Sequence, residues 1–197
     1  MSADLSPTHP RQALFEAGEA PPALPVCDHY CGVEARMRKS LALQVELGPV
    51  FDVTLDCEDG APVGGESEHA HLVAELALSA DNRHGRVGAR VHPVGHPAFE
   101  DDLRTIVGRA GSRLAYLMVP KPRDAADVDR ACAAIDRASA AAGLTRSIPV
   151  HVLVETHGAL REVDAIAAHP RIESVSFGLM DFVSAHRGAI PAAGMRV

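Results

Sequence analysis

The chain has 197 residues, of which 47% are hydrophobic, 23% charged and 4% aromatic, and its net charge at pH 7 is −7. This length fits one sizeable globular domain. The acidic balance, with no clustered Lys/Arg stripe, argues against a nucleic-acid surface. No apolar run approaches the roughly 18 residues that a membrane span needs. The four scattered cysteines and the absence of an evident signal peptide predict reduced thiols in the cytoplasm.

Short β-branched segments alternate along the chain with segments of helical periodicity. Residues 1–25 carry five prolines and predict an N-terminal arm ahead of a domain at 26–197. Strands are predicted at 26–32, 50–57, 86–91, 114–119, 149–154 and 172–177. Helices are predicted at 34–47, 66–79, 99–110, 124–142 and 159–168, with Asp124 as an N-cap. This alternation of strands and helices predicts an α/β fold with a parallel sheet.

Two α/β architectures compete for this pattern, the doubly wound sheet and the (β/α)8 barrel. The loop at 60–65 lacks the G-x-G-x-x-G spacing of a doubly wound nucleotide binder, and the chain has no G-x-x-x-x-G-K-[ST] motif. Polar residues instead follow five consecutive strands: Asp56, Glu58 and Asp59, then Arg90 and His92, Lys121, Glu155 and Asp181. This favours the barrel, whose βα loops converge over one mouth. Only about six of the eight βα units are present, so we expect a barrel that these residues alone cannot close.

Two carboxylates stand at the ends of the last two predicted strands. V-H-V-L-V-E-T-H-G at 150–158 places Glu155 after one strand, and F-G-L-M-D-F at 177–182 places Asp181 after the next. Two such acids suit Mg²⁺, which prefers oxygen ligands and keeps several waters. The alternative is that each acid caps the helix that follows its strand.

The other polar candidates have structural alternatives of their own. Arg90 is either a site residue or half of a buried ion pair with Glu58 or Asp59. Lys121, between two prolines, is either a solvated loop charge or a Schiff-base lysine, although a lysine site would not need the paired acids. We expect His69 and His71 on the surface of a helix. The spacing of Cys27 and Cys31 gives only weak support for zinc.

Five motifs in the same order resemble a known family. They are L-D-C-E-D-G-A at 55–61, A-R-V-H at 89–92, M-V-P-K-P at 118–122, L-V-E-T-H-G at 153–158 and F-G-L-M-D-F at 177–182. They resemble L-D-L-E-D-A-V, V-R-V-N, L-P-K-V, I-E-T-A-x-G and F-G-x-x-D-L of the citrate lyase β-subunit and its relatives in the HpcH/HpaI aldolase superfamily. The first strand, D-H-Y-C-G, does not resemble the family's R-S-L-L-F-V-P-G. His92 also replaces the usual asparagine.

The resemblance implies a (β/α)8 TIM barrel of the phosphoenolpyruvate/pyruvate type. It implies a Mg²⁺-dependent carbon–carbon lyase that acts on a 3-hydroxy acid or its CoA thioester, in a cytoplasmic homo-oligomer, either a trimer or a hexamer. The implied metal ligands are Glu155 and Asp181. The implied catalytic residues are Arg90, Glu58 and Asp59, and the implied substrate-binding residues are Arg90, Lys121 and Gly178.

Two other functions stay open beside the thioester lyase. One is a class II aldolase that releases pyruvate and uses no CoA. The other is a non-catalytic subunit that binds a metal or a carboxylate.

Overall fold

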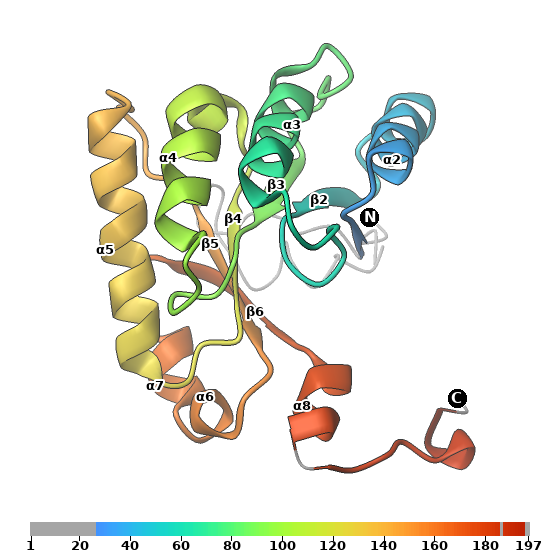
Figure 1. Ribbon diagram of the computed structural model, residues 1–197, viewed down its shortest axis with the longest axis vertical. Coiled ribbons are helices and arrows are strands. Elements are labelled where there is room, and N and C mark those ends of the chain that lie inside the picture. The colour runs from blue at the N-terminus through green and yellow to red at the C-terminus, as the bar shows by residue number, and fades with distance from the viewer. Residues whose placement is uncertain (1–26, 186, 196–197) are drawn as a thin grey trace, which may run out of the picture.

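The computed structural model describes residues 27–185 and 187–195 (Figure 1). The predicted arm at 1–25 lies outside the described residues. The strands form one sheet in which every neighbouring pair is parallel and the order follows the sequence. They are β1 (Asp28–Cys31), β2 (Asp52–Asp56), β3 (Val87–Arg90), β4 (Leu117–Pro120), β5 (Val150–Val154) and β6 (Ile172–Phe177).

Helices follow the strands in the alternation that the sequence predicts. The helices are α2 (Glu34–Leu47), α3 (Glu66–Leu78), α4 (Phe99–Ala110), α5 (Ala125–Ala141), α6 (His157–Arg161), α7 (Val163–Ala167) and α8 (Leu179–Ala185), with 3-10 turns η1 (Gly111–Arg113) and η2 (Ala192–Met195). In Figure 1 the helices α2 to α5 stand side by side along one face of the curled sheet. A doubly wound sheet would reverse its strand order, so this sequential order confirms the predicted barrel architecture as a curled half-barrel.

The two faces of the sheet carry different side chains, because successive residues of a strand point to opposite faces. Valines, leucines and alanines of β2 to β5 pack with the helices in the hydrophobic core. The other face carries Asp52, Thr54, Asp56, Arg90, His151 and Glu155, all buried. Strands β2 to β5 are buried throughout, whereas β1 and β6 are partly exposed. The inner face is therefore polar, and the sheet is most open at its two edges.

A tyrosine fills the inner face below the strand ends. The ring of Tyr116 stacks on His151 with centroids 3.9 Å apart, and its hydroxyl lies 2.7 Å from Thr54 Oγ1. Gly88 makes room for this ring, since a Cβ at that position would lie 2.2 Å from Tyr116 Cε2. The mouth, which is the carboxyl end of the sheet on its inner face, thus rests on a packed layer of side chains.

The predicted helix bounds hold for α2 and α4 and differ most after β5. Asp124 caps α5 as predicted, with its side chain accepting the N–H of Asp127 at 2.8 Å. The single helix predicted at 159–168 is instead two short helices, α6 and α7, because Glu162 leaves the helical region with φ −108° and ψ 16°. Helix α8 was not predicted.

Candidate active site

The polar residues singled out in the sequence meet at the carboxyl end of the sheet. Arg90 ends β3, Lys121 follows β4, Glu155 follows β5 and Asp181 lies in the first turn of α8. Ion pairs join this group to the acidic loop after β2. Parallel strands deliver their carboxyl ends to one edge, so residues far apart in sequence form one cluster.

The main partner of Arg90 is a carboxylate other than the two that the sequence predicts as its partners. Its Nε and Nη2 donate to the two oxygens of Asp56 at 2.7 and 2.6 Å, and its Nη1 lies 3.2 Å from Glu58 Oε2. The expected partners were Glu58 or Asp59, but the main partner is Asp56, which lies opposite Arg90 in the β2–β3 register. Burial opposes the charge of Arg90, but the bond to Asp56 and the charges of Asp56 and Glu58 together outweigh it and raise the pKa of Arg90.

Asp56 also shapes the loop that follows β2. Its Oδ1 accepts the N–H of Glu58 at 2.9 Å, and its Oδ2 accepts the N–H of Gly60 at 2.8 Å. The backbone oxygen of Asp56 lies 2.8 Å from Nε2 of His69. The prediction of a surface position for His69 is wrong, because this contact buries its ring below the acidic loop. One residue therefore fixes both the guanidinium and the loop beside it.

Lys121 lies inside the cluster of acids. Its Nζ donates to Glu58 Oε1 at 2.5 Å and to Asp59 Oδ2 at 2.6 Å, and it lies 3.2 Å from Asp181 Oδ2. Its backbone has φ +50°, a left-handed conformation that few residues other than glycine adopt. Burial opposes its charge, but the bonds to Asp59 and Glu58 outweigh it and raise the pKa of Lys121. A lysine held as a cation is a poor Schiff-base nucleophile.

Glu155 is a buried carboxylate with unused bonding capacity. It is 5% exposed, and its Oε2 has no hydrogen-bond partner among the described residues. Burial, together with the charge of Asp181, raises its pKa to about 7. Thr156 caps α6 by accepting the N–H of Ala159 at 3.1 Å, so the alternative that Glu155 caps this helix is wrong.

Gly178 packs directly on Glu155. A Cβ at residue 178 would lie 2.3 Å from Glu155 Cγ and 2.4 Å from its Oε1. The glycine that follows β6 therefore leaves the space that this carboxylate fills.

The donor set fits a hard divalent cation. A buried carboxylate without a partner is costly unless a cation or a proton neutralises it. Asp181 is a partly exposed carboxylate near Glu155, and its charge contributes to the raised pKa there. Within the described part of the chain no group of three or more His, Cys, Asp or Glu is arranged around a metal position. Two carboxylates completed by water and substrate suit Mg²⁺, whereas a closed zinc site needs four ligands.

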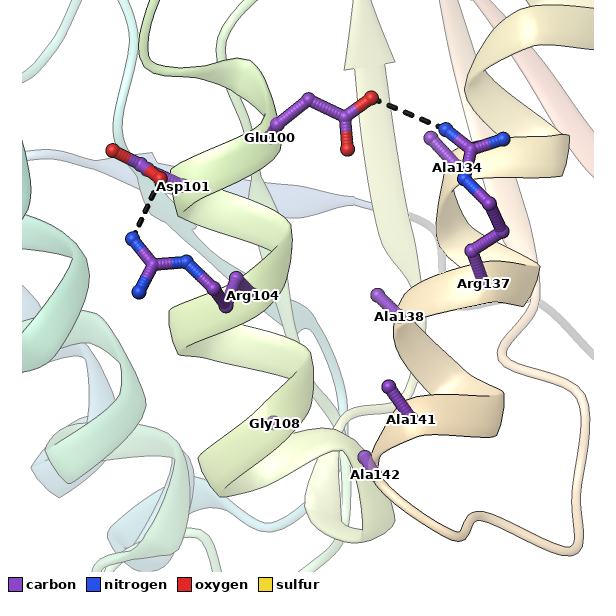
Figure 2. A pocket seen from close by; sticks show the side chains of 9 residues that line it. All are labelled: Glu100, Asp101, Arg104, Gly108, Ala134, Arg137, Ala138, Ala141 and Ala142. Carbon is purple, nitrogen blue, oxygen red and sulfur yellow. Dashed lines mark hydrogen bonds and ion pairs between the residues drawn. The ribbon is translucent and has the colours of Figure 1, made fainter.

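Other hollows of the surface lie outside this cluster. A groove of about 480 Å³ runs between α4 and α5, over a floor of small residues that includes Gly108, Ala134 and Ala138 (Figure 2). Its rim carries an exposed ion pair of 3.2 Å between Arg137 and Glu100. It belongs to the outer, helical face and not to the strand ends.

A smaller hollow of about 290 Å³ adjoins the acidic loop. His92 lines it, with Nδ1 2.7 Å from Asp102 Oδ2 and a ring stacked on His96 at 4.2 Å. The bond to Asp102 raises the pKa of His92. This histidine is thus fixed to α4, beside the mouth.

Within the described residues no helix combines the length and apolar character required to cross a membrane.

The chain is similar to known proteins. The model of the HpcH/HpaI aldolase/citrate lyase family matches residues 45–193. L-malyl-CoA/β-methylmalyl-CoA lyase from Cereibacter sphaeroides is 26% identical over 171 residues, which are 86% of this chain and 53% of that protein. Malyl-CoA/β-methylmalyl-CoA/citramalyl-CoA lyase from Chloroflexus aurantiacus is 29% identical over 135 residues, 66% of this chain and 38% of that one.

Solved structures share the fold. A citrate lyase from Burkholderia xenovorans is 52% identical with a TM-score of 0.85, over 94% of this chain and 56% of that one. The citrate lyase β subunit from Mycobacterium tuberculosis, crystallised with oxaloacetate and magnesium, is 21% identical with a TM-score of 0.64, over 87% of this chain and 67% of that one. The chain spans about half the length of the C. sphaeroides lyase. It belongs to the HpcH/HpaI aldolase/citrate lyase family.

Proposed function

We propose that the protein is a Mg²⁺-dependent carbon–carbon lyase that cleaves a 3-hydroxyacyl-CoA thioester of the malyl-CoA or citramalyl-CoA type. One observation carries the proposal: a buried glutamate with an unpaired oxygen, Glu155, shares one mouth with Arg90, a guanidinium locked by Asp56. The names of the relatives, lyases of malyl-CoA and citramalyl-CoA, support the reaction class.

Glu155 and Asp181 would hold the metal. When bound, the ion supplies Lewis acidity at the oxo or hydroxy carboxylate of the substrate and orients it. Gly178 keeps the space that Glu155 needs. The raised pKa of Glu155 fits this role, because a cation beside it would restore the charged form.

Arg90 would stabilise the charge that develops during cleavage. The hydroxyl proton of the substrate passes to water in the site, and the hydroxyl oxygen becomes a carbonyl. The electrons of the broken C–C bond form an enolate with the thioester carbonyl, and this enolate then takes up a proton from water to give the released thioester. Asp56 occupies one edge of the guanidinium, which leaves N–H bonds on its terminal nitrogens for the enolate oxygen or a carboxylate. One such donor is typically worth ~3–4 kcal/mol of transition-state stabilisation.

Glu58, Asp59 and Lys121 would set the charge around Arg90. Lys121 joins both acids of the β2 loop to Asp181 and so holds the loop against α8. Its ammonium also offers a positive contact to the carboxylate of a substrate that enters between them.

The test combines metal binding with turnover. Calorimetry should give saturable Mg²⁺ binding that oxaloacetate strengthens, and E155Q should weaken it roughly 100-fold or more, since even outer-shell changes cost 10–100-fold. E162Q is the matched control, because Glu162 is an exposed residue whose side chain accepts the N–H of Ala125 on the outer surface.

Turnover separates the candidate functions. Cleavage of L-malyl-CoA without cleavage of free malate supports the thioester lyase. Release of pyruvate from a 4-hydroxy-2-oxo acid would support the class II aldolase instead. Mg²⁺ binding that is identical in wild type and E155Q would refute the metal site.

A further inference from the structure

Tyr30 stands on the inner face of β1 and belongs to no motif that relates the chain to its family. The family match begins at residue 45, and the first strand, D-H-Y-C-G, departs from the family pattern. Any role of Tyr30 must therefore be read from its own contacts.

The Tyr30 side chain spans the concave face of the sheet and passes beneath Arg90. The guanidinium carbon Cζ of Arg90 lies over the ring at 5.5 Å from its centroid. The hydroxyl donates a 2.8 Å hydrogen bond to Sδ of Met118, which belongs to β4. Because β2 and β3 lie between β1 and β4 in the sheet, Tyr30 reaches across two strands to make this bond.

Two contacts together define the orientation of the guanidinium. Asp56 holds one edge through two hydrogen bonds, which fixes the position of the group within its own plane. An edge contact alone leaves the plane able to tilt. The carbon Cζ of Arg90 also lies over the ring of Tyr30, whose negative quadrupole attracts the cation and so restrains this tilt.

Tyr30 is suited to act as a fixed neutral surface. Tyr30 is 36% exposed, so part of the residue stays open to solvent beside Arg90. Burial, then the charge of Asp28, raises the pKa of Tyr30, and Glu155 contributes in the same direction. The phenol therefore stays protonated at neutral pH and donates to Met118.

We propose that Tyr30 is a positioning residue that sets the tilt of Arg90 and lies within reach of a small oxo or hydroxy acid whose carboxylate Arg90 binds. The inference rests on the proposed function for the identity of that ligand. It adds a specificity element outside the family motifs.

Tyrosine fluorescence can report on each tyrosine separately, because the chain has two tyrosines and no tryptophan. In Y116F the tyrosine fluorescence comes from Tyr30 alone, and in Y30F it comes from Tyr116 alone. Malonate, a small dicarboxylate with little near-ultraviolet absorbance, serves as the ligand in the presence of Mg²⁺. We expect a saturable change of fluorescence in Y116F and none in Y30F, since Tyr116 lies under the site against His151.

Y30L tests the positioning role. Loss of the ring should weaken malonate binding and raise the KM for L-malyl-CoA, each roughly two- to thirty-fold. This is the range that the loss of a cation–π contact supports. Y30F keeps the ring and should change both less than about threefold. In the unliganded protein, the NMR resonance of the Arg90 Nε–H, which is bonded to Asp56, should shift in Y30L through lost ring current and hold its place in Y30F.

The outcomes separate the two proposals. If Y30L binds malonate as tightly as wild type does, and malonate leaves the Tyr30 fluorescence of Y116F unchanged, the role of Tyr30 is overturned and the proposed function stays intact. If wild type does not bind malonate but the Arg90 resonance still responds to Y30L, the Tyr30–Arg90 contact is supported. The proposed function and the contact of Tyr30 with the ligand are then refuted. An Arg90 resonance insensitive to Y30L would overturn the positioning role in every case.

Discussion

Asp56 and Arg90 face each other across neighbouring strands and share two hydrogen bonds of 2.7 and 2.6 Å, with both side chains buried. Burying such a pair costs desolvation energy that the contact must offset, and removing one partner leaves an uncompensated charge. The same aspartate holds the N–H groups of Glu58 and Gly60. The strand end and the acidic loop therefore depend on one carboxylate.

The first prediction concerns this carboxylate. D56N should lower the free energy of unfolding by about 3–5 kcal/mol, because Arg90 stays buried without its charged partner. Urea unfolding measures this change. D59N is the control, since Asp59 is exposed and its pairing with Lys121 is worth about 1 kcal/mol at most. Equal losses in the two variants would contradict the assignment of Asp56 as the main partner of Arg90.

The second prediction is a pH dependence. In the folded chain the pKa of Glu155 is raised from 4.5 to about 7, so the folded state keeps a proton that the unfolded chain releases. Stability in metal-free buffer should therefore fall as pH rises between these two values, by an amount on the order of 2–3 kcal/mol, and level off above.

E155Q isolates this effect from other titrating groups such as Asp28 and His92, whose pKa values are also raised. Unfolding midpoints of wild type and E155Q, compared at pH 5 and pH 8, give the difference. Excess Mg²⁺ should flatten the wild-type slope, because the metal binds the deprotonated carboxylate. A pH slope equal in both proteins would show that Glu155 titrates normally.

The third prediction uses two glycines. G178A should lower stability by about 1–3 kcal/mol and weaken Mg²⁺ binding, since its Cβ would collide with the side chain of Glu155. G108A is the matched substitution in α4, where a Cβ meets nothing within 4 Å. It should raise stability by roughly 0.5–1 kcal/mol and leave Mg²⁺ binding alone. Calorimetry and urea unfolding on both variants provide the measurement.

The fourth prediction concerns Lys121. K121M should lower stability without Mg²⁺ by about 1–3 kcal/mol, because Glu58, Asp59 and Asp181 lose their shared cation. Mg²⁺ should restore more stability than in wild type and bind more tightly, since no ammonium competes for Asp181. K39M, a change of the exposed lysine in α2, should alter neither quantity. Weaker Mg²⁺ binding in K121M would instead identify Lys121 as a support of the metal site.

Hydrophobic periodicity and the Gly and Pro breaks between segments predicted the strands and most helices, because these signals are local in sequence. The polar residues after five consecutive strands favoured the barrel. The partner of Arg90 could not be predicted, since it depends on the register between β2 and β3, although alternation along D-V-T-L-D already placed Asp56 on the inner face with Thr54. The surface position expected for His69 failed for a similar reason, because the loop that covers it comes from β2.

The contacts of Tyr30 also could not be predicted from the sequence. Its partners Arg90 and Met118 lie 60 and 88 residues away in sequence, the second separation being that of its hydrogen bond. No motif joins them, and the curl of the sheet lets the side chain of Tyr30 reach Met118 across two intervening strands.

The sequential strand order also has a consequence for how the chain folds. Each strand pairs with the next one along the chain, as Val53 does with Val87 and Leu117 with Val150, so every step of sheet growth closes a loop of similar, modest length. The sheet can thus assemble progressively from the amino end as the polypeptide leaves the ribosome. Among the described strands, β1 and β6 lie at the edges and are partly exposed, so their amide hydrogens should exchange sooner than those of the buried strands β2 to β5.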